Sequence, residues 1–140
     1  MKKIIFSILV CILFITFGLS ANDLKKLQGV WESNEKYIRK DFRAFVIFKK
    51  NQMYIILQKA MRTMISVDIE EATGGKIYLS EYSFLGDGYK TYKLKDKDTL
   101  YFPVSEYPYK RIYPGFMDKY TLKLLEDIEW NYDDFRHIFQ

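Results

Sequence analysis

The chain has 140 residues, enough for one domain, and carries a formal net charge of +4. Hydrophobic residues make up 49% and charged residues 29%, which excludes a disordered composition. Without Lys2 and Lys3, 20 basic and 18 acidic residues remain; their net charge of +2 is too small to indicate a nucleic-acid partner.

The N-terminal segment has the three parts of a secretory signal peptide. Met1-Lys2-Lys3 is basic, residues 4–17 are almost all apolar, and Gly18-Leu19-Ser20-Ala21 offers small residues for cleavage. We therefore expect a signal peptide over residues 1–20, cleaved near Ser20 or Ala21, and a secreted or periplasmic domain over residues 21–140. A retained anchor is the alternative, but the apolar run is shorter than the roughly 18 to 20 residues of a membrane-spanning helix.

Cys11 is the only cysteine, and it lies inside this N-terminal segment. Acylation of Cys11 is disfavoured because Val10 precedes it, where a small residue is expected. The domain that follows has no thiol, which excludes disulfides, Cys₄ zinc sites and thiol nucleophiles there.

Short apolar segments separated by turn residues follow in close succession. A helical turn is expected over residues 22–26. Residues 62–71 alternate between apolar and polar side chains, and turn signals stand at residues 50–51, 73–76, 86–88 and 95–98. The strands are expected over residues 29–33, 41–49, 53–59, 62–71, 76–84, 89–95, 99–104 and 109–113. This spacing predicts an all-β fold, an antiparallel up-and-down barrel of about eight short strands.

The pattern changes after Pro114-Gly115. Apolar and aromatic residues recur there at helical spacing, at Met117, Tyr120, Leu124, Ile128 and Tyr132. Asp118 near the start of this segment suits a helix dipole. We expect a helix over about residues 117–129, packed outside the barrel. For residues 131–140 the sequence predicts no definite structure.

Gly29-Val30-Trp31 opens the first strand, residues 97–102 read Lys-Asp-Thr-Leu-Tyr-Phe, and a helix follows the last strand. In these features the chain resembles the lipocalin-like proteins of the calycin superfamily. The resemblance implies an eight-stranded barrel with a cavity for small apolar molecules. It also implies a structural closure made by Gly29, Trp31 and Arg111, with the guanidinium across the indole ring. The chain departs from the family in being short and in lacking disulfides, which favours a small or filled cavity.

Tyrosines are concentrated in the second half of the barrel. A phenol combines an apolar ring with a polar tip, so Tyr78, Tyr82, Tyr92 and Tyr101 are the candidate ligand-binding residues. Three alternatives to a pocket stay open: tyrosine favours strands, a low-GC coding sequence enriches it, and outward rings can form a protein-contact face.

Sequence signals for catalysis or metal binding are nearly absent. The chain has no nucleophile elbow, phosphate-binding glycine loop or metal-binding histidine pair. His137 is expected to be exposed, Asp68 and Glu70 to share a solvated strand face, and Asp133-Asp134 to cap a helix or form a loose acidic patch. We therefore predict no catalytic residue, no metal site and no cofactor.

Three functional hypotheses follow. The first is an exported lipocalin-like protein that binds a small apolar or amphipathic ligand in the barrel. The second is a solid barrel that acts as a protein-interaction or inhibitor module in the cell envelope, because its strands carry apolar residues on both faces: Phe45, Ile47, Ile55, Ile56 and Leu57. The third, an outer-membrane barrel, is weaker because membrane strands need about 9 to 11 residues and most of the strands expected here are shorter. We expect the mature chain not to span a membrane.

Overall fold

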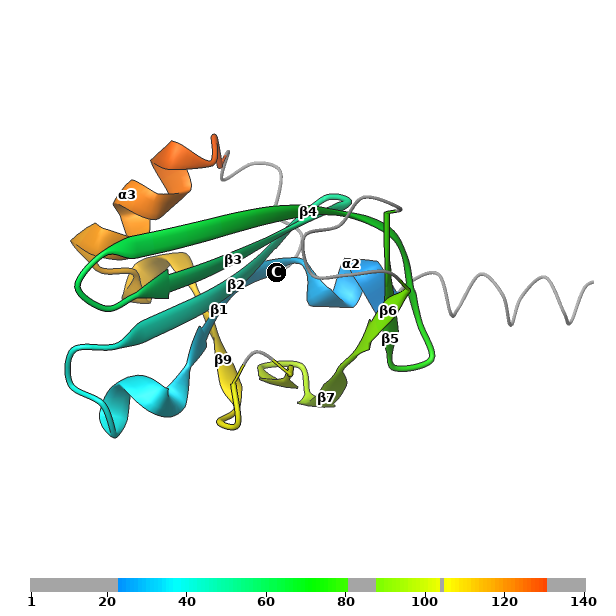
Figure 1. Cartoon of the computed structure of the whole chain (residues 1–140), viewed down its shortest axis with the longest axis horizontal. Helices are drawn as coiled ribbons and strands as arrows, with labels where there is room; N and C mark the ends of the chain where they lie inside the picture. Colours follow the sequence, from blue (N-terminus) through cyan, green and yellow to red (C-terminus); the bar gives the residue numbers. More distant parts are fainter. Residues whose placement is uncertain (1–22, 81–87, 104, 131–140) are drawn as a thin grey trace, which may run out of the picture.

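The computed structural model describes residues 23–80, 88–103 and 105–130. In this part of the chain, nine antiparallel strands form one sheet that curls into a nearly closed barrel (Figure 1). The strands are β1 (Gly29–Ser33), β2 (Arg43–Lys49), β3 (Gln52–Gln58), β4 (Arg62–Thr73), β5 (Lys76–Leu79), β6 (Tyr89–Thr91), β7 (Lys93–Asp96), β8 (Thr99–Tyr101) and β9 (Tyr109–Ile112). The helices are α2 (Asp23–Leu27) and α3 (Lys119–Asp127), with 3₁₀ turns η1 (Asn34–Tyr37) and η2 (Pro114–Phe116).

The strand order is that of a meander. It runs β6-β5-β4-β3-β2-β1-β9-β8-β7, so β1 pairs with both β2 and β9. The two edge strands, β6 and β7, are consecutive in the chain with Tyr92 alone between them. The expected strand over residues 89–95 is therefore bent at Tyr92, which explains nine strands in place of about eight. The predicted all-β antiparallel barrel is confirmed.

The inside of the barrel holds a core of buried side chains. Alternation along the strands sends these residues to one face. The buried members of this core are Leu27, Trp31, Ala44, Val46, Phe48, Met53, Ile55, Val67, Ile69, Ala72, Ile77, Leu79, Tyr92, Leu100, Phe102 and Tyr109. Leu27 and the partly buried Leu24 reach this core from α2, the short helix expected over residues 22–26. The inner core thus joins α2 to strands from both halves of the sheet.

Helix α3 lies against the outside of the barrel (Figure 1), and a second core of buried side chains joins it to the barrel wall. This core joins Leu124, Leu125 and Ile128 to outward residues of β1, β2 and β3, which are Val30, Phe45, Ile47 and Ile56. The predicted packing of a C-terminal helix outside the barrel is confirmed. It also explains why these strands are apolar on both faces: the outer face is covered by this chain's own helix.

The helix α3 is shorter than expected because side chains cap both of its ends. The carboxylate of Asp118 accepts a hydrogen bond from the Thr121 amide at 2.9 Å, so Asp118 is the N-cap and the helix begins at Lys119. The ammonium of Lys49 donates to the carbonyls of Ile128 and Glu129 at 3.0 and 2.9 Å. The N-cap and Lys49 fix the length and position of α3.

The β2–β3 turn differs in one detail from its sequence signal. Residues 50–51 signal a turn because Asn tolerates positive φ, but it is Lys50 that takes the left-handed conformation, with φ 55°. The side chain of Gln28 accepts from the Lys50 amide at 2.6 Å and donates to its carbonyl at 2.7 Å. A distant side chain therefore holds Lys50 in a conformation that its own residue type disfavours.

Candidate functional site

The barrel wall separates where the chain passes from β6 to β7. Thr91 pairs with Lys76 of β5, whereas Lys93 pairs with Tyr101 of β8. Tyr92 stands between the two pairings, and its amide donates to the Gly75 carbonyl at 2.9 Å. The two edge strands β6 and β7 are therefore joined only through the backbone at Tyr92, and each pairs with a different neighbouring strand.

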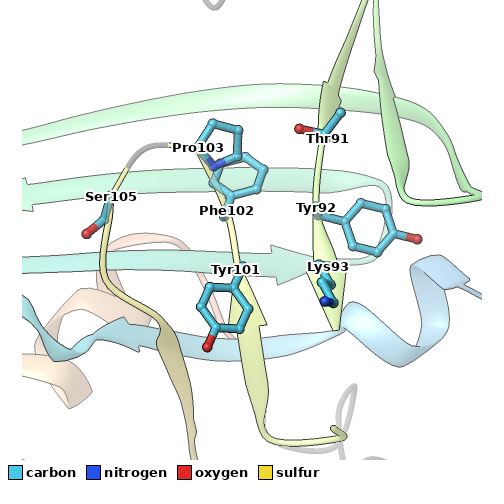
Figure 2. Close-up of a pocket in the computed structure, with 7 residues that line it drawn as sticks. All are labelled: Thr91, Tyr92, Lys93, Tyr101, Phe102, Pro103 and Ser105. Atoms are coloured by element: carbon cyan, nitrogen blue, oxygen red, sulfur yellow. The ribbon is translucent and has the colours of Figure 1, made fainter. Parts of the chain in front are cut away.

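A hollow of about 350 Å³ lies at this separation (Figure 2). The residues that line it come from β6, β7, β8 and the segment after β8: Thr91, Tyr92, Lys93, Tyr101, Phe102, Pro103 and Ser105. Tyr92 and Phe102 are buried, whereas the Tyr101 side chain is 38% exposed. The hollow therefore has an apolar wall toward the core and an aromatic rim toward solvent.

The phenol of Tyr92 is already engaged inside the protein. Its hydroxyl donates to the Asp23 carboxylate of α2 at 2.8 Å, and in Figure 2 its ring points away from Tyr101. Burial, followed by the hydrogen bond and charge of Asp23, raises the pKa of Tyr92 well above its ordinary value. The hydroxyl of Tyr92 therefore ties α2 to the barrel wall.

A second hollow of about 430 Å³ adjoins the first at Ser105. It is lined by Glu35, Ile38, Arg39, Ser105, Glu106 and Tyr107. The Ser105 hydroxyl lies 3.1 Å from that of Ser33 and donates to the Glu35 carboxylate at 3.4 Å. The hydroxyl also accepts from the Tyr107 amide at 3.1 Å, so Ser105 separates an acidic hollow from an aromatic one.

The four candidate tyrosines fall in different places. Tyr92 and Tyr101 line the first hollow together. Tyr78 lies on the outer face of β5, with its ring centroid 5.8 Å from that of Tyr89, and it does not line this hollow. Tyr82 lies outside the described residues. Phe102, Pro103 and Ser105 also line the hollow but were not predicted as ligand-binding residues. Their position depends on where the pairing of β8 ends, which the sequence does not show.

Gly29, Trp31 and Arg111 meet at the junction of the first and last strands. Trp31 is fully buried and pairs in register with Arg111. The Arg111 guanidinium carbon lies 4.2 Å from the Trp31 ring centroid. Its nitrogens donate to the carbonyls of Lys26 at 2.7 Å, Lys97 at 3.1 Å and Gln28. Burial lowers the pKa of Arg111, and the charges of Tyr113 and Asp98 oppose that shift. These contacts hold β9 against β1, the last strand of the chain against the first.

A charged network at the start of α3 was not foreseen from the sequence. Glu32 is 2% exposed and accepts from Arg43 at 2.7 and 3.1 Å and from Lys36 at 3.0 Å. Arg43 also pairs with Asp118 at 2.8 Å. Burial alone would lower the pKa of Arg43, but hydrogen bonds and charges from Glu32 and Asp118 raise it. The sequence places Glu32 on the outer face of β1, next to the inward Trp31, but it does not show that Arg43 is the partner of Glu32.

The described residues contain no group of three or more His, Cys, Asp or Glu side chains placed to hold a metal ion. Asp68 and Glu70 lie on the exposed face of β4. Cys11, Asp133, Asp134 and His137 lie outside the described residues. The helices of the described part are too short to cross a membrane.

We compared the chain with protein-family models, with curated proteins and with solved structures, and none of the three comparisons returned a match.

Proposed function

We propose that the protein is an exported, lipocalin-like barrel that binds a small apolar or amphipathic ligand. The observation that carries this proposal is the hollow of about 350 Å³ at the bend in the barrel wall, lined by Tyr92, Tyr101, Phe102 and Pro103. Ligand sites combine apolar and aromatic walls with a few polar groups, and their volumes begin at about 300 Å³. Tyr101 forms the exposed rim and Phe102 the buried wall of such a site.

The first experiment uses phenylnaphthylamine, an uncharged fluorescent probe whose emission rises in apolar surroundings. The protein is expressed with its whole N-terminal segment and purified from the compartment where it accumulates. Saturable binding is expected. The variant Tyr101→Ala removes the aromatic rim and is expected to weaken binding about fivefold or more, because a buried aromatic contact contributes about 1 kcal/mol or more.

Tyr89→Ala is the matched control. Tyr89 is also an exposed tyrosine on an outer strand face, at 47% exposure, but it does not line the hollow. It is expected to leave probe binding unchanged. No saturable binding to the folded protein, or an equal loss in both variants, would count against a ligand site at this place.

The second candidate function is a protein-interaction module of the cell envelope. The apolar outer strand faces support it less than the sequence indicated, because α3 covers Phe45, Ile47 and Ile56. The observation that still favours it is the exposure of Tyr37 at 76% and Ile38 at 61%, beside the acidic hollow. If Tyr37→Ser and Ile38→Ser abolish co-purification of an envelope protein and Tyr101→Ala does not, the module is the better description.

A further inference from the structure

We propose that the hollow at the bend selects ligands with an anionic head, and that the ammonium group of Lys93 binds this head. The inference rests on the proposed ligand-binding function and adds the charge class of the ligand. It also assigns an orientation, with the anion at the Lys93 end and the apolar body against Phe102 and Pro103.

The lining of the hollow carries a single charge. Among the seven residues that line the hollow, Lys93 is the one with a charged side chain. The others supply aromatic, aliphatic and hydroxyl groups. An anion in this hollow therefore meets an attractive charge and no carboxylate of the lining.

The ammonium of Lys93 is accessible to a ligand. Lys93 is exposed and stands on the outer face of β7, in register with Tyr101. The ion pairs of the described residues involve Lys36, Arg39, Arg43, Arg62 and Arg111, and Lys93 takes part in none of them. Cation–π contacts engage other cations of the chain. Its ammonium can therefore pair with a ligand without breaking an ion pair inside the described structure.

The charges at the two ends of the hollow orient the ligand. At the opposite end of the hollow, the Ser105 hydroxyl donates to the Glu35 carboxylate, which pairs with Arg39 at 3.5 Å. The adjoining acidic hollow is lined by two acidic residues, Glu35 and Glu106, and one basic residue, Arg39, so its net charge is negative. An anion is repelled at that end and attracted at the other, so the head lies beside Lys93. In Figure 2, Ser105 and Lys93 lie on opposite sides of the hollow.

The experiment compares two probes that share one body. Anilinonaphthalene sulfonate and phenylnaphthylamine have the same fused rings, and the first carries a sulfonate. We expect the sulfonate to bind the wild-type protein about three to five times more tightly, the gain of one exposed ion pair. The ratio is expected to fall to about one in Lys93→Gln and to persist in Lys93→Arg.

Lys95→Gln is the matched control, because Lys95 is an exposed lysine of the same strand that does not line the hollow. It is expected to keep the wild-type ratio. Raising the salt concentration to about 0.5 M is expected to reduce the ratio without changing the affinity for the uncharged probe.

The two proposals fail in different ways. Equal affinities for the two probes in the wild type, or a ratio that Lys93→Gln leaves unchanged, overturn the anionic selectivity while the uncharged probe still binds. Loss of the ratio in Lys95→Gln as well as in Lys93→Gln overturns the assignment to Lys93. If neither probe binds the folded protein, the proposed ligand-binding function fails with the inference.

Discussion

The guanidinium of Arg111 lies over the ring of Trp31, 4.2 Å from its centroid, and the two residues are direct partners in the β1–β9 ladder. This contact joins the first strand of the barrel to the last. Because Arg111 also donates to three backbone carbonyls, it combines a cation–π contact with hydrogen bonds from a charged donor.

Arg111→Ala is therefore expected to lower the free energy of unfolding by about 2 to 4 kcal/mol. Chemical denaturation followed by circular dichroism measures this change. Lys95→Ala, a change at an exposed lysine, should stay within about 0.5 kcal/mol of the wild type. An effect of Arg111→Ala as small as that of Lys95→Ala would show that the contact contributes little.

Because Gly29 has no side chain, the guanidinium of Arg111 can lie close to its backbone. The φ of Gly29 is +131°, and a Cβ added there would lie 2.7 Å from a terminal nitrogen of Arg111. Gly29→Ala is expected to cost about 1 to 3 kcal/mol, because the backbone is strained and the guanidinium must move. Gly115→Ala is the control, since a Cβ there meets no atom within 4 Å.

A double variant separates the two causes. In the background of Arg111→Ala, the clash is absent and only the backbone strain of Gly29→Ala remains. The cost of Gly29→Ala is therefore expected to be smaller there than in the wild type. Equal costs in the two backgrounds would mean that the guanidinium does not restrict residue 29.

Local patterns were enough to predict the barrel and its outer helix. Alternation and turn residues predicted both ends of β1 correctly. They also placed the ends of β2, β3 and β9 within one or two residues of those observed. The helical spacing of Leu124 and Ile128 identified the face that packs on the barrel. These elements are readable because each depends on residues close together in the sequence.

The candidate site was only partly predictable. Tyr92 and Tyr101 were chosen for their chemistry, but the hollow exists because β6 and β7 take different partners at Tyr92. That change of partner depends on residues of other strands and turns, such as Gly75, whose carbonyl accepts from the Tyr92 amide. Strand alternation likewise could not show that α3 covers Phe45 and Ile47.

The N-terminal segment gives a prediction about processing. Because Gly18 and Ser20 are small residues suited to a cleavage site, the exported protein is expected to begin at Ala21 or Asn22. Intact mass measurement of the exported protein tests this. Ser20→Leu should block cleavage, whereas Cys11→Ser should leave it unchanged. A block by Cys11→Ser would indicate acylation of that cysteine instead.

Asp118 gives a prediction about acid stability. Burial alone would raise its pKa, but hydrogen bonds from Thr121 and Arg43 and the charge of Arg43 lower it. A carboxyl whose pKa is lower in the folded state contributes stability above its unfolded pKa of about 4, and that contribution is lost as the pH falls through the folded value. The melting temperature of the wild type should therefore fall below about pH 4.

Asp118→Asn is expected to flatten this acid-dependent loss, because an asparagine still caps the helix but does not titrate. Glu126→Gln, at an exposed carboxyl of the same helix, serves as the control and should retain the wild-type profile. If the profile of Asp118→Asn stays parallel to that of the wild type below pH 4, another group is responsible for the loss.

Substitution by phenylalanine is expected to have opposite effects at two buried tyrosines, Tyr109 and Tyr92. The hydroxyl of Tyr109 is fully buried and has no hydrogen-bond partner among the residues that the structure describes, whereas that of Tyr92 donates to Asp23 at 2.8 Å. An unpaired buried hydroxyl costs about 1 to 3 kcal/mol, and a paired one contributes about 1 kcal/mol. Tyr109→Phe is therefore expected to raise the free energy of unfolding by about 1 kcal/mol, and Tyr92→Phe to lower it by about the same amount.

Denaturation of the two variants beside the wild type measures both effects, because each change removes one oxygen and keeps the ring. Desolvation by burial also raises the pKa of both phenols, so neither should ionise near pH 10, the pKa of a tyrosine in a model peptide. Absorbance titration of each variant should then show the same number of groups ionising near pH 10 as in the wild type. A loss of stability in Tyr109→Phe would mean that its hydroxyl is bonded inside the barrel.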